Sequence, residues 1–163
     1  HSGVVPDVVT MAKAMGNGMP VGACWARADV AAVFQPGDHG STYSGTALAT
    51  AAVNAVIDEM QRIDAPAVAV RQGQRIVDAL RVVPGVVHVR GRGLMLGVEL
   101  ADGIDAKVVY LDLLQRGVIV NAVTPTTIRL VPPITVTDAE IDEAVAMIAA
   151  SLAEALATNE VAT

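Results

Sequence analysis

Apolar residues near the N-terminus form two short runs, Val8–Ala12 and Val21–Ala26, on either side of a glycine-containing turn. Short apolar runs bounded by turn residues are typical of buried strands. A helical turn is expected over Ala28–Phe34, and the Pro-, Gly- and Ser-rich stretch Gln35–Gly45 is expected to be a loop. We therefore interpret this part of the chain as the end of a domain with a parallel sheet.

From Thr46 the apolar positions change to helical spacing, which predicts a long helix ending near Arg62. The residues on its apolar face are Leu48, Ala52, Val53, Val56, Ile57 and Met60. Asp64 can cap a second helix, which Pro84 and Gly85 bring to an end. The inward residues of that helix are Val68, Ile76, Val77 and Leu80. The pattern thus predicts two consecutive helices.

The remainder of the chain alternates between strand and helix patterns. Strands are predicted at Val86–Val89, Leu94–Leu100, Val118–Asn121 and Thr127–Leu130. A helix over Asp105–Arg116 is closed by Gly117. Thr137 and Glu140 have the spacing of a capping box and begin a last helix. Its apolar stripe is Ile141, Val145, Ile148, Leu152 and Leu156. This order predicts an α+β domain.

The composition fits one domain or parts of two. The chain has 163 residues, of which 53% are hydrophobic, and its mean hydropathy is +0.50. A chain with this many apolar residues is expected to have apolar surface, which is covered by other segments or by another subunit. No apolar run is long enough to span a bilayer, and the chain, which begins at His1, has no basic leader. We expect a cytosolic protein and interpret the chain as a fragment of a longer one.

The charge of the chain and its cysteine and histidine content argue against a nucleic-acid-binding protein and against a metal site. The net charge of −6 repels phosphate backbones, and only one Trp, two Tyr and one Phe could stack on bases, so nucleic acid is not an expected partner. The single cysteine, Cys24, lies in an apolar stretch and is expected to be a small buried residue. His1, His39 and His88 have no metal-ligand spacing, so no metal is expected.

The segment from Asp7 to Ala23, DVVTMAKAMGNGMPVGA, places Lys13 between an apolar run and a turn with two glycines and a proline. A lysine that leaves a buried strand loses hydration, which favours the neutral amine and makes it a nucleophile toward carbonyl groups. Most lysines are nevertheless solvated, and a strand followed by a glycine turn is common. The residues alone therefore leave both interpretations of Lys13 open.

This segment resembles the cofactor-lysine motif of the class III pyridoxal-phosphate aminotransferases. The matching residues are Pro6, Asp7, Thr10, Lys13, Gly18, Pro20, Gly22 and Ala23. Three further segments resemble the acetylornithine aminotransferase branch: GDHGSTYSG from Gly37, RGRGLMLGVEL from Arg90 and GVIVNAVTPTTIRLVPPITVTDAEID from Gly117. They occur in the family's order and cover nearly the whole chain. The chain is accordingly identified as a member of this family.

The resemblance implies an α/β fold, the C-terminal part of a PLP-dependent transferase of fold type I. Residues 1–63 would be a remnant of the large PLP-binding domain, the end of its parallel sheet, with a linking helix. Residues 64–163 would be the small C-terminal α+β domain. Lys13 would hold pyridoxal 5'-phosphate covalently and, once displaced by the amino substrate, would transfer a proton from the substrate carbon to the cofactor.

The resemblance also suggests residues for the phosphate and for the substrate. Ser41 and Thr42 would bind the cofactor phosphate of the neighbouring subunit in a homodimer, although Ser44 and Thr46 stand where the family has glycine and asparagine. Arg129 would bind carboxylate groups near the substrate entrance, since a guanidinium can hold a carboxylate through two hydrogen bonds; a solvated arginine is the alternative. No role is assigned to Arg90 or Arg92. Glu99 needs a partner if it is buried, and the sequence names none.

The function that this resemblance implies is transfer of the terminal amine of N-acetylornithine, or a similar ω-amine, to 2-oxoglutarate, a reaction of arginine biosynthesis. The family's other cofactor and substrate residues lie upstream of this chain. We therefore expect the isolated chain to be inactive, to bind cofactor weakly and to self-associate. Two alternatives stay open: a class III enzyme acting on ornithine or 4-aminobutyrate, and a non-catalytic interaction domain.

Overall fold

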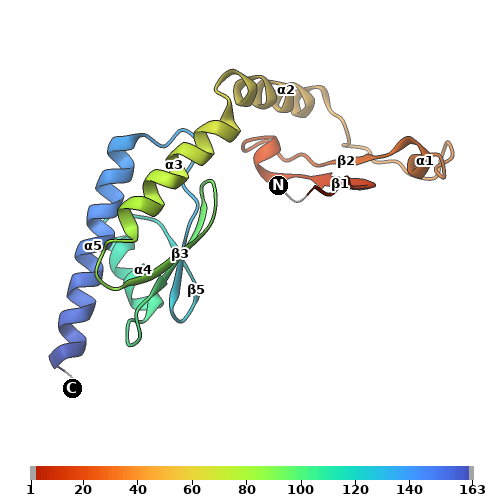
Figure 1. The fold of residues 1–163 in the computed structure, drawn as a ribbon. Helices are drawn as coiled ribbons and strands as arrows, with labels where there is room; N and C mark the ends of the chain where they lie inside the picture. Colours follow the sequence, from red (N-terminus) through yellow and green to blue (C-terminus); the bar gives the residue numbers. More distant parts are fainter. Residues whose placement is uncertain (1–2, 162–163) are drawn as a thin grey trace. The chain divides into compact units, whose positions relative to one another are not determined.

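A computed structural model describes residues 3–161 of the chain, and the side chains of residues 3–158. His1 and Ser2 at one end and Ala162 and Thr163 at the other lie outside the described residues. The chain divides into two compact units, His1–Ile63 and Asp64–Thr163 (Figure 1). No helix in the described part of the chain is both long enough and apolar enough to cross a membrane.

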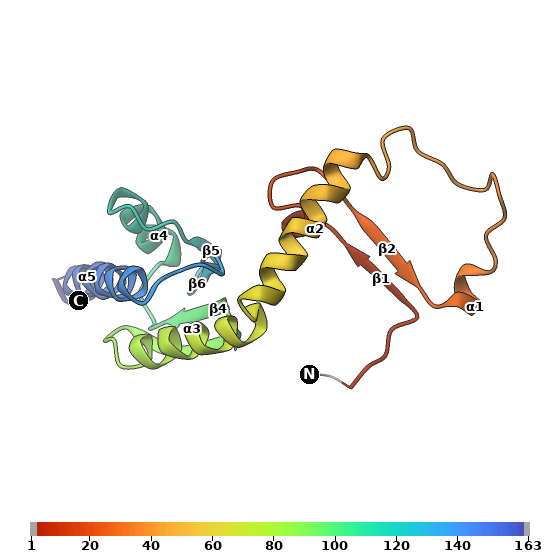
Figure 2. The same cartoon turned by 90° about the horizontal axis from the view of Figure 1, so that it is seen from above.

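The first unit contains a two-stranded sheet of β1 (Val8–Met11) and β2 (Ala23–Ala26), which pair antiparallel with Val8 opposite Ala26 (Figure 2). Between them lies η1 (Lys13–Met15), a single 3-10 turn. The prediction of strands at these places is confirmed, but the prediction that they are buried is wrong. Only Val9 and Ala26 are half-buried, and the pair is antiparallel rather than parallel. Two strands with no layer packed on either face cannot bury their side chains.

The rest of the first unit is helix and loop. The short α1 (Ala28–Ala31) ends before the predicted Phe34, and residues 32–46 are irregular and exposed. The long α2 (Ala47–Arg62) is present as predicted, but of its residues only Ala49 is buried. Cys24 is exposed, contrary to the expectation of a small buried residue, because it lies in the uncovered β2. Most apolar residues of this unit therefore form surface and not core.

The second unit is an antiparallel sheet with three helices. Along the chain come α3 (Ala65–Leu80), β3 (Val86–Arg92), β4 (Met95–Leu100), α4 (Ala106–Gln115), β5 (Asn121–Thr124), β6 (Thr127–Leu130) and α5 (Asp138–Val161). The strands lie in the order β3-β4-β6-β5. This order of strands and helices is the predicted α+β arrangement.

Three local predictions in this unit need correction. The strand predicted over Val86–Val89 continues to Arg92, because its pairing with β4 extends to Met95. The third strand begins at Asn121, not Val118, because the amides of Gly117 and Val118 bond back to the end of α4 and direct Val120 into the core. Asp64 precedes α3 as predicted, but it has a left-handed backbone with φ of 48° and its side chain caps nothing.

The core of this unit lies between one face of the sheet and the helices. Leu80, Leu113, Ile148 and Leu152 from the helices pack with strand residues that are 9% exposed or less: Leu96, Val98, Leu100, Ile128 and Leu130. Fully burying one such side chain stabilises the fold by about 1.5–3 kcal/mol. The opposite face of the sheet carries polar residues, among them Arg90, Glu99 and Arg129.

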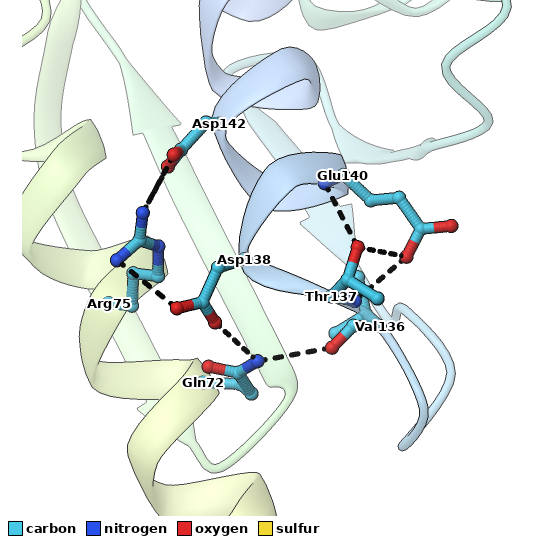
Figure 3. A network of polar contacts seen from close by, with 7 residues as sticks. All are labelled: Gln72, Arg75, Val136, Thr137, Asp138, Glu140 and Asp142. Carbon is cyan, nitrogen blue, oxygen red and sulfur yellow. Dashed lines mark hydrogen bonds and ion pairs between the residues drawn. The ribbon is translucent and has the colours of Figure 1, made fainter.

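The N-terminus of α5 has the predicted capping box (Figure 3). The amide of Glu140 donates to the Thr137 hydroxyl at 3.2 Å, and the amide of Thr137 donates to the Glu140 carboxylate at 2.8 Å. The hydrogen bond from the Thr137 backbone holds the pKa of the Glu140 carboxyl below its ordinary value. The box thus fixes where α5 begins.

Side chains of α3 form hydrogen bonds and ion pairs with the N-terminal end of α5 (Figure 3). The buried Gln72 amide donates to the Val136 carbonyl at 3.1 Å and to the Asp138 carboxylate at 2.9 Å. Arg75 pairs with Asp142 at 2.7 Å and with Asp138 at 3.7 Å. These contacts join residues more than 60 positions apart and hold α3 and α5 together on the sheet.

Candidate functional site

Lys13 is the first residue of η1, and only Ala12 separates it from the end of β1. Its backbone is left-handed, with φ of 54°, a region that costs a non-glycine residue about 1–2 kcal/mol. Such strain persists only where surrounding structure enforces it, and it gathers at functional sites. The conformation makes Lys13 a candidate functional residue, as the sequence motif does.

The surroundings of the Lys13 side chain differ from the expectation. The residue is exposed, so the predicted loss of hydration does not occur in this chain. Its ammonium has no hydrogen bond or ion pair to any side chain described between residues 3 and 158. The amine is therefore accessible to a ligand, and nothing in the described chain withdraws water from it.

The turn after Lys13 requires glycine at two positions, at Gly16 for lack of space and at Gly18 for its backbone angle. The Gly16 amide donates to the Lys13 carbonyl at 3.2 Å. A β-carbon on Gly16 would lie 2.3 Å from the Met19 carbonyl oxygen, so no larger residue fits there. Gly18 has φ of 104°, which other residues rarely adopt. The backbone conformation of the turn that follows Lys13 therefore requires these two glycines.

Asp7, part of the resemblance but without a predicted role, contacts Arg27. Arg27 donates its backbone amide to the Asp7 carbonyl at 3.0 Å, and its guanidinium lies 2.7 Å from the Asp7 carboxylate. Arg27 also pairs with Asp29, which holds the pKa of Asp29 below its ordinary value. Asp7 thus helps to tie the start of β1 to the end of β2. The pair cannot be predicted from the sequence, because the antiparallel pairing of β1 with β2 brings the two residues together.

Ser41 and Thr42 lie in the exposed loop between α1 and α2. Their hydroxyls form no hydrogen bond within the described chain, and none links them to Lys13. Gly45 has a left-handed backbone with φ of 65°, which shapes the loop just after them. The two hydroxyls are therefore free to bind a ligand, and the structure does not join them to Lys13.

Arg129 belongs to the other unit, in the middle of β6. Its neighbours Ile128 and Leu130 point into the core, whereas Arg129 is exposed on the opposite face of the sheet. Its guanidinium forms no ion pair with the side chains of residues 3–158. An exposed arginine without a carboxylate partner can bind an external carboxylate.

The structure supplies the missing partner of Glu99. Its carboxylate lies 2.6 Å from the Arg90 guanidinium, across the pairing of β3 with β4. Both side chains are partly exposed, so Glu99 is not a buried charge. The sequence could not show this pair, because it depends on strand register.

A cavity of about 600 Å³ lies in the second unit. Its walls are mainly apolar, with Ile76, Leu130 and Ile148 among them, and Glu140 and Glu143 also line it. None of Lys13, Ser41, Thr42 and Arg129 lines this cavity. It therefore gives no support to the predicted chemistry.

Comparison with known families matches residues 1–152 to the family described as aminotransferase class-III. The acetylornithine aminotransferase of Corynebacterium efficiens is 47% identical over 154 residues, 94% of this chain and 38% of that protein. The Bacillus subtilis acetylornithine aminotransferase is 40% identical over 163 residues, 98% of this chain and 42% of its own length. The chain spans about two fifths of the length of these curated relatives.

Solved structures agree with this. An ornithine aminotransferase from Toxoplasma gondii superposes with a TM-score of 0.87 at 32% identity, over 97% of this chain and 39% of that one. That structure is described as having partial occupancy of PLP at its active site. An acetylornithine aminotransferase from Elizabethkingia anophelis superposes with a TM-score of 0.83 at 29% identity, over 93% of this chain and 42% of its own. The predicted fold class, part of a PLP-dependent transferase of fold type I, is therefore confirmed.

Proposed function

This chain belongs to the class III aminotransferases, and we propose that the complete protein moves the terminal amine of N-acetylornithine to 2-oxoglutarate. By the complete protein we mean the product of the whole reading frame that contains these 163 residues. The names of the curated relatives support the amino donor. The reaction would serve arginine biosynthesis in the cytoplasm.

The observation that carries the proposal is the backbone of Lys13. A lysine held at φ of 54° by a tight glycine turn, with its amine exposed and unpaired in the described chain, fits the attachment of pyridoxal phosphate. The exposed hydroxyls of Ser41 and Thr42 fit the phosphate. These three residues would hold the cofactor, with Ser41 and Thr42 serving the other subunit of a homodimer.

Bound pyridoxal phosphate supplies a ring that takes up the electrons left on the substrate carbon when its proton is removed. Lys13 has two roles in our proposal: its amine first holds the cofactor and, after the substrate displaces it, moves that proton. A proton-transferring lysine must be neutral, which requires loss of hydration. Because Lys13 is exposed in this chain, we infer that parts of the protein outside it cover the amine.

Arg129 is proposed to bind the carboxylate of substrates. Its guanidinium is exposed and unpaired in the described chain, and the buried residues on both sides of it fix its strand. A bidentate hydrogen-bonded pair would orient the substrate. Because Lys13 and Arg129 belong to different units, catalysis needs the whole protein to hold them in one geometry. We accordingly propose that the isolated chain is inactive.

Ornithine is a second candidate donor. The ornithine aminotransferase from Toxoplasma gondii superposes well on this chain, with a TM-score of 0.87, which favours a shared scaffold but does not distinguish the two amines. Acetylation removes one of ornithine's two charged amines, so the enzyme's preference reports whether its pocket accepts a neutral amide or a cation.

The test is an amino-donor panel on the complete protein. N-acetylornithine, ornithine and 4-aminobutyrate are each supplied with 2-oxoglutarate, and glutamate formation is measured. We expect the highest kcat/KM with N-acetylornithine. A preference for ornithine would select the second candidate. Absence of turnover with every donor, in protein that binds pyridoxal phosphate, would contradict the proposed function.

A further inference from the structure

The exposed face of the second unit's sheet places one carboxylate between two arginines. Glu99 lies on the central strand β4, Arg90 on β3 and Arg129 on β6. Gly97 of β4 is opposite both Arg90 and Arg129, so the two arginines occupy the same row of the sheet. Glu99 is two residues further along β4 and is therefore a diagonal neighbour of both.

All three side chains project from the same face. Residues directly opposite in an antiparallel pair share a face, and positions two apart on one strand do so as well. A β-carbon built on Gly97 would lie 3.8 Å from the Arg90 Cγ, which confirms the shared direction for Arg90. Diagonal neighbours on a sheet are within reach of long side chains. Both guanidiniums can therefore reach the Glu99 carboxylate.

Of the two arginines, only Arg90 pairs with the Glu99 carboxylate. The Arg90 Nη1 lies 2.6 Å from the Glu99 Oε2, whereas Arg129 has no ion pair with the described side chains. Gly97 offers no side chain between the two arginines. The pairing of Glu99 with Arg90 leaves Arg129 positively charged and accessible.

We propose that Arg90 is a positioning residue that keeps Glu99 from pairing with Arg129, and so preserves Arg129 for carboxylate substrates. This inference rests on the proposed function of Arg129. Without Arg90, the Glu99 carboxylate turns to the remaining basic side chains within reach, which are Arg129 on β6 and His88, directly opposite on β3. An intramolecular carboxylate on Arg129 then competes with the substrate carboxylate.

The test compares variants of the complete protein by their KM for 2-oxoglutarate. Arg90→Ala is expected to raise that KM about two- to fivefold with kcat unchanged, the range of an exposed ion pair. Arg90→Ala combined with Glu99→Gln is expected to restore the wild-type KM, because the competing charge is gone. Arg90→Lys keeps a cation beside Glu99, so its KM for 2-oxoglutarate is expected to lie between those of wild type and Arg90→Ala.

Arg92→Ala is the matched control. Arg92 is on the same strand and face, two residues from Arg90, and forms no ion pair within the described side chains. Arg92→Ala removes one positive charge from the same face of the sheet, as Arg90→Ala does, but it leaves the pair of Glu99 with Arg90 intact. The KM for 2-oxoglutarate is therefore expected to stay near the wild-type value. An equal rise in Arg92→Ala, or a rise in Arg90→Ala that Glu99→Gln does not reverse, would overturn the inference.

Arg129→Ala separates this inference from the proposed function. A large rise in KM for that variant, with no change in Arg90→Ala, would overturn the role of Arg90 and leave the role of Arg129 intact. An unchanged KM in Arg129→Ala would overturn both roles. The wild-type donor panel tests the transamination itself.

Discussion

Gly73 of α3 lies directly against the backbone of Gly93, in the turn between β3 and β4. A β-carbon on Gly73 would lie 2.0 Å from the Gly93 carbonyl oxygen. Glycine in a helix interior costs up to about 1 kcal/mol relative to alanine. The close approach explains why this helix contains one: the missing side chain lets α3 pack directly on the sheet turn.

Gly73→Ala is therefore expected to lower the free energy of unfolding by about 1–2 kcal/mol, because overpacking against backbone outweighs the gain in helix propensity. Urea unfolding followed by circular dichroism measures it. Gly97→Ala is the control, since its new methyl group would meet Thr127 at an ordinary 3.6 Å. Equal stability of the Gly73 variant and wild type would contradict the close packing.

The capping box of α5 gives a prediction about pH. The pKa of Glu140 is lowered by hydrogen bonds from Thr137, so this contribution to stability is complete above the ordinary value of 4.5 and is lost as the pH falls through the folded-state pKa. Glu140→Gln keeps an acceptor oxygen but cannot titrate. We expect its stability to fall less steeply below pH 4.5 than that of wild type.

The measurement is urea unfolding at a series of pH values. Glu143→Gln is the matched control, because that carboxylate is on the same helix and does not accept from Thr137. An identical acid profile for wild type and Glu140→Gln would show that the box contributes nothing to acid sensitivity.

The left-handed backbone of Lys13 predicts a conflict between stability and activity. Both Lys13→Ala and Lys13→Gly lose the amine and are expected to lose turnover. Glycine adopts φ of 54° without steric cost, so Lys13→Gly is expected to be about 1 kcal/mol more stable than Lys13→Ala. Thermal unfolding of the complete protein compares them.

Ala14→Gly provides the comparison at the next position, which is not among the positive-φ residues, and there glycine is expected to destabilise. If Lys13→Gly were less stable than Lys13→Ala, the strain at this residue would be refuted.

Thr42→Ala is expected to weaken retention of pyridoxal phosphate while leaving turnover at saturating cofactor nearly unchanged. A lost hydroxyl removes a hydrogen bond to the phosphate, which is remote from the reacting carbon. Cofactor titration of the apoprotein measures the change, with Ser44→Ala as control in the same exposed loop. Unchanged cofactor affinity in Thr42→Ala would exclude this residue from phosphate binding.

The second unit could be predicted largely from local pattern. The helices over residues 65–80 and 106–115 and the capping box at Thr137 follow from apolar spacing and turn chemistry, which act within one element. The ion pair of Arg90 with Glu99 and the contact of Gly73 with Gly93 could not be predicted, because each depends on how distant elements pair. The same holds for Arg27 and Asp7.

Burial in the first unit was predicted wrongly. The apolar runs around Lys13 predict buried strands, and strands do form there, yet the described residues of this unit contain no layer packed on them. Sequence pattern reports what a surface is suited to contact, not whether the contact is present. The exposure of Cys24 and of Lys13 has the same origin.

The central claim is that Lys13 carries the cofactor. The complete protein is incubated with pyridoxal phosphate, reduced with borohydride to fix the cofactor to its amine, digested and examined by mass spectrometry. We predict a pyridoxyl group on the peptide that contains Lys13 and none on the peptide that contains Lys107, the other lysine of this chain. Modification of Lys107 instead, or an unmodified Lys13 in protein that binds the cofactor, would contradict the account.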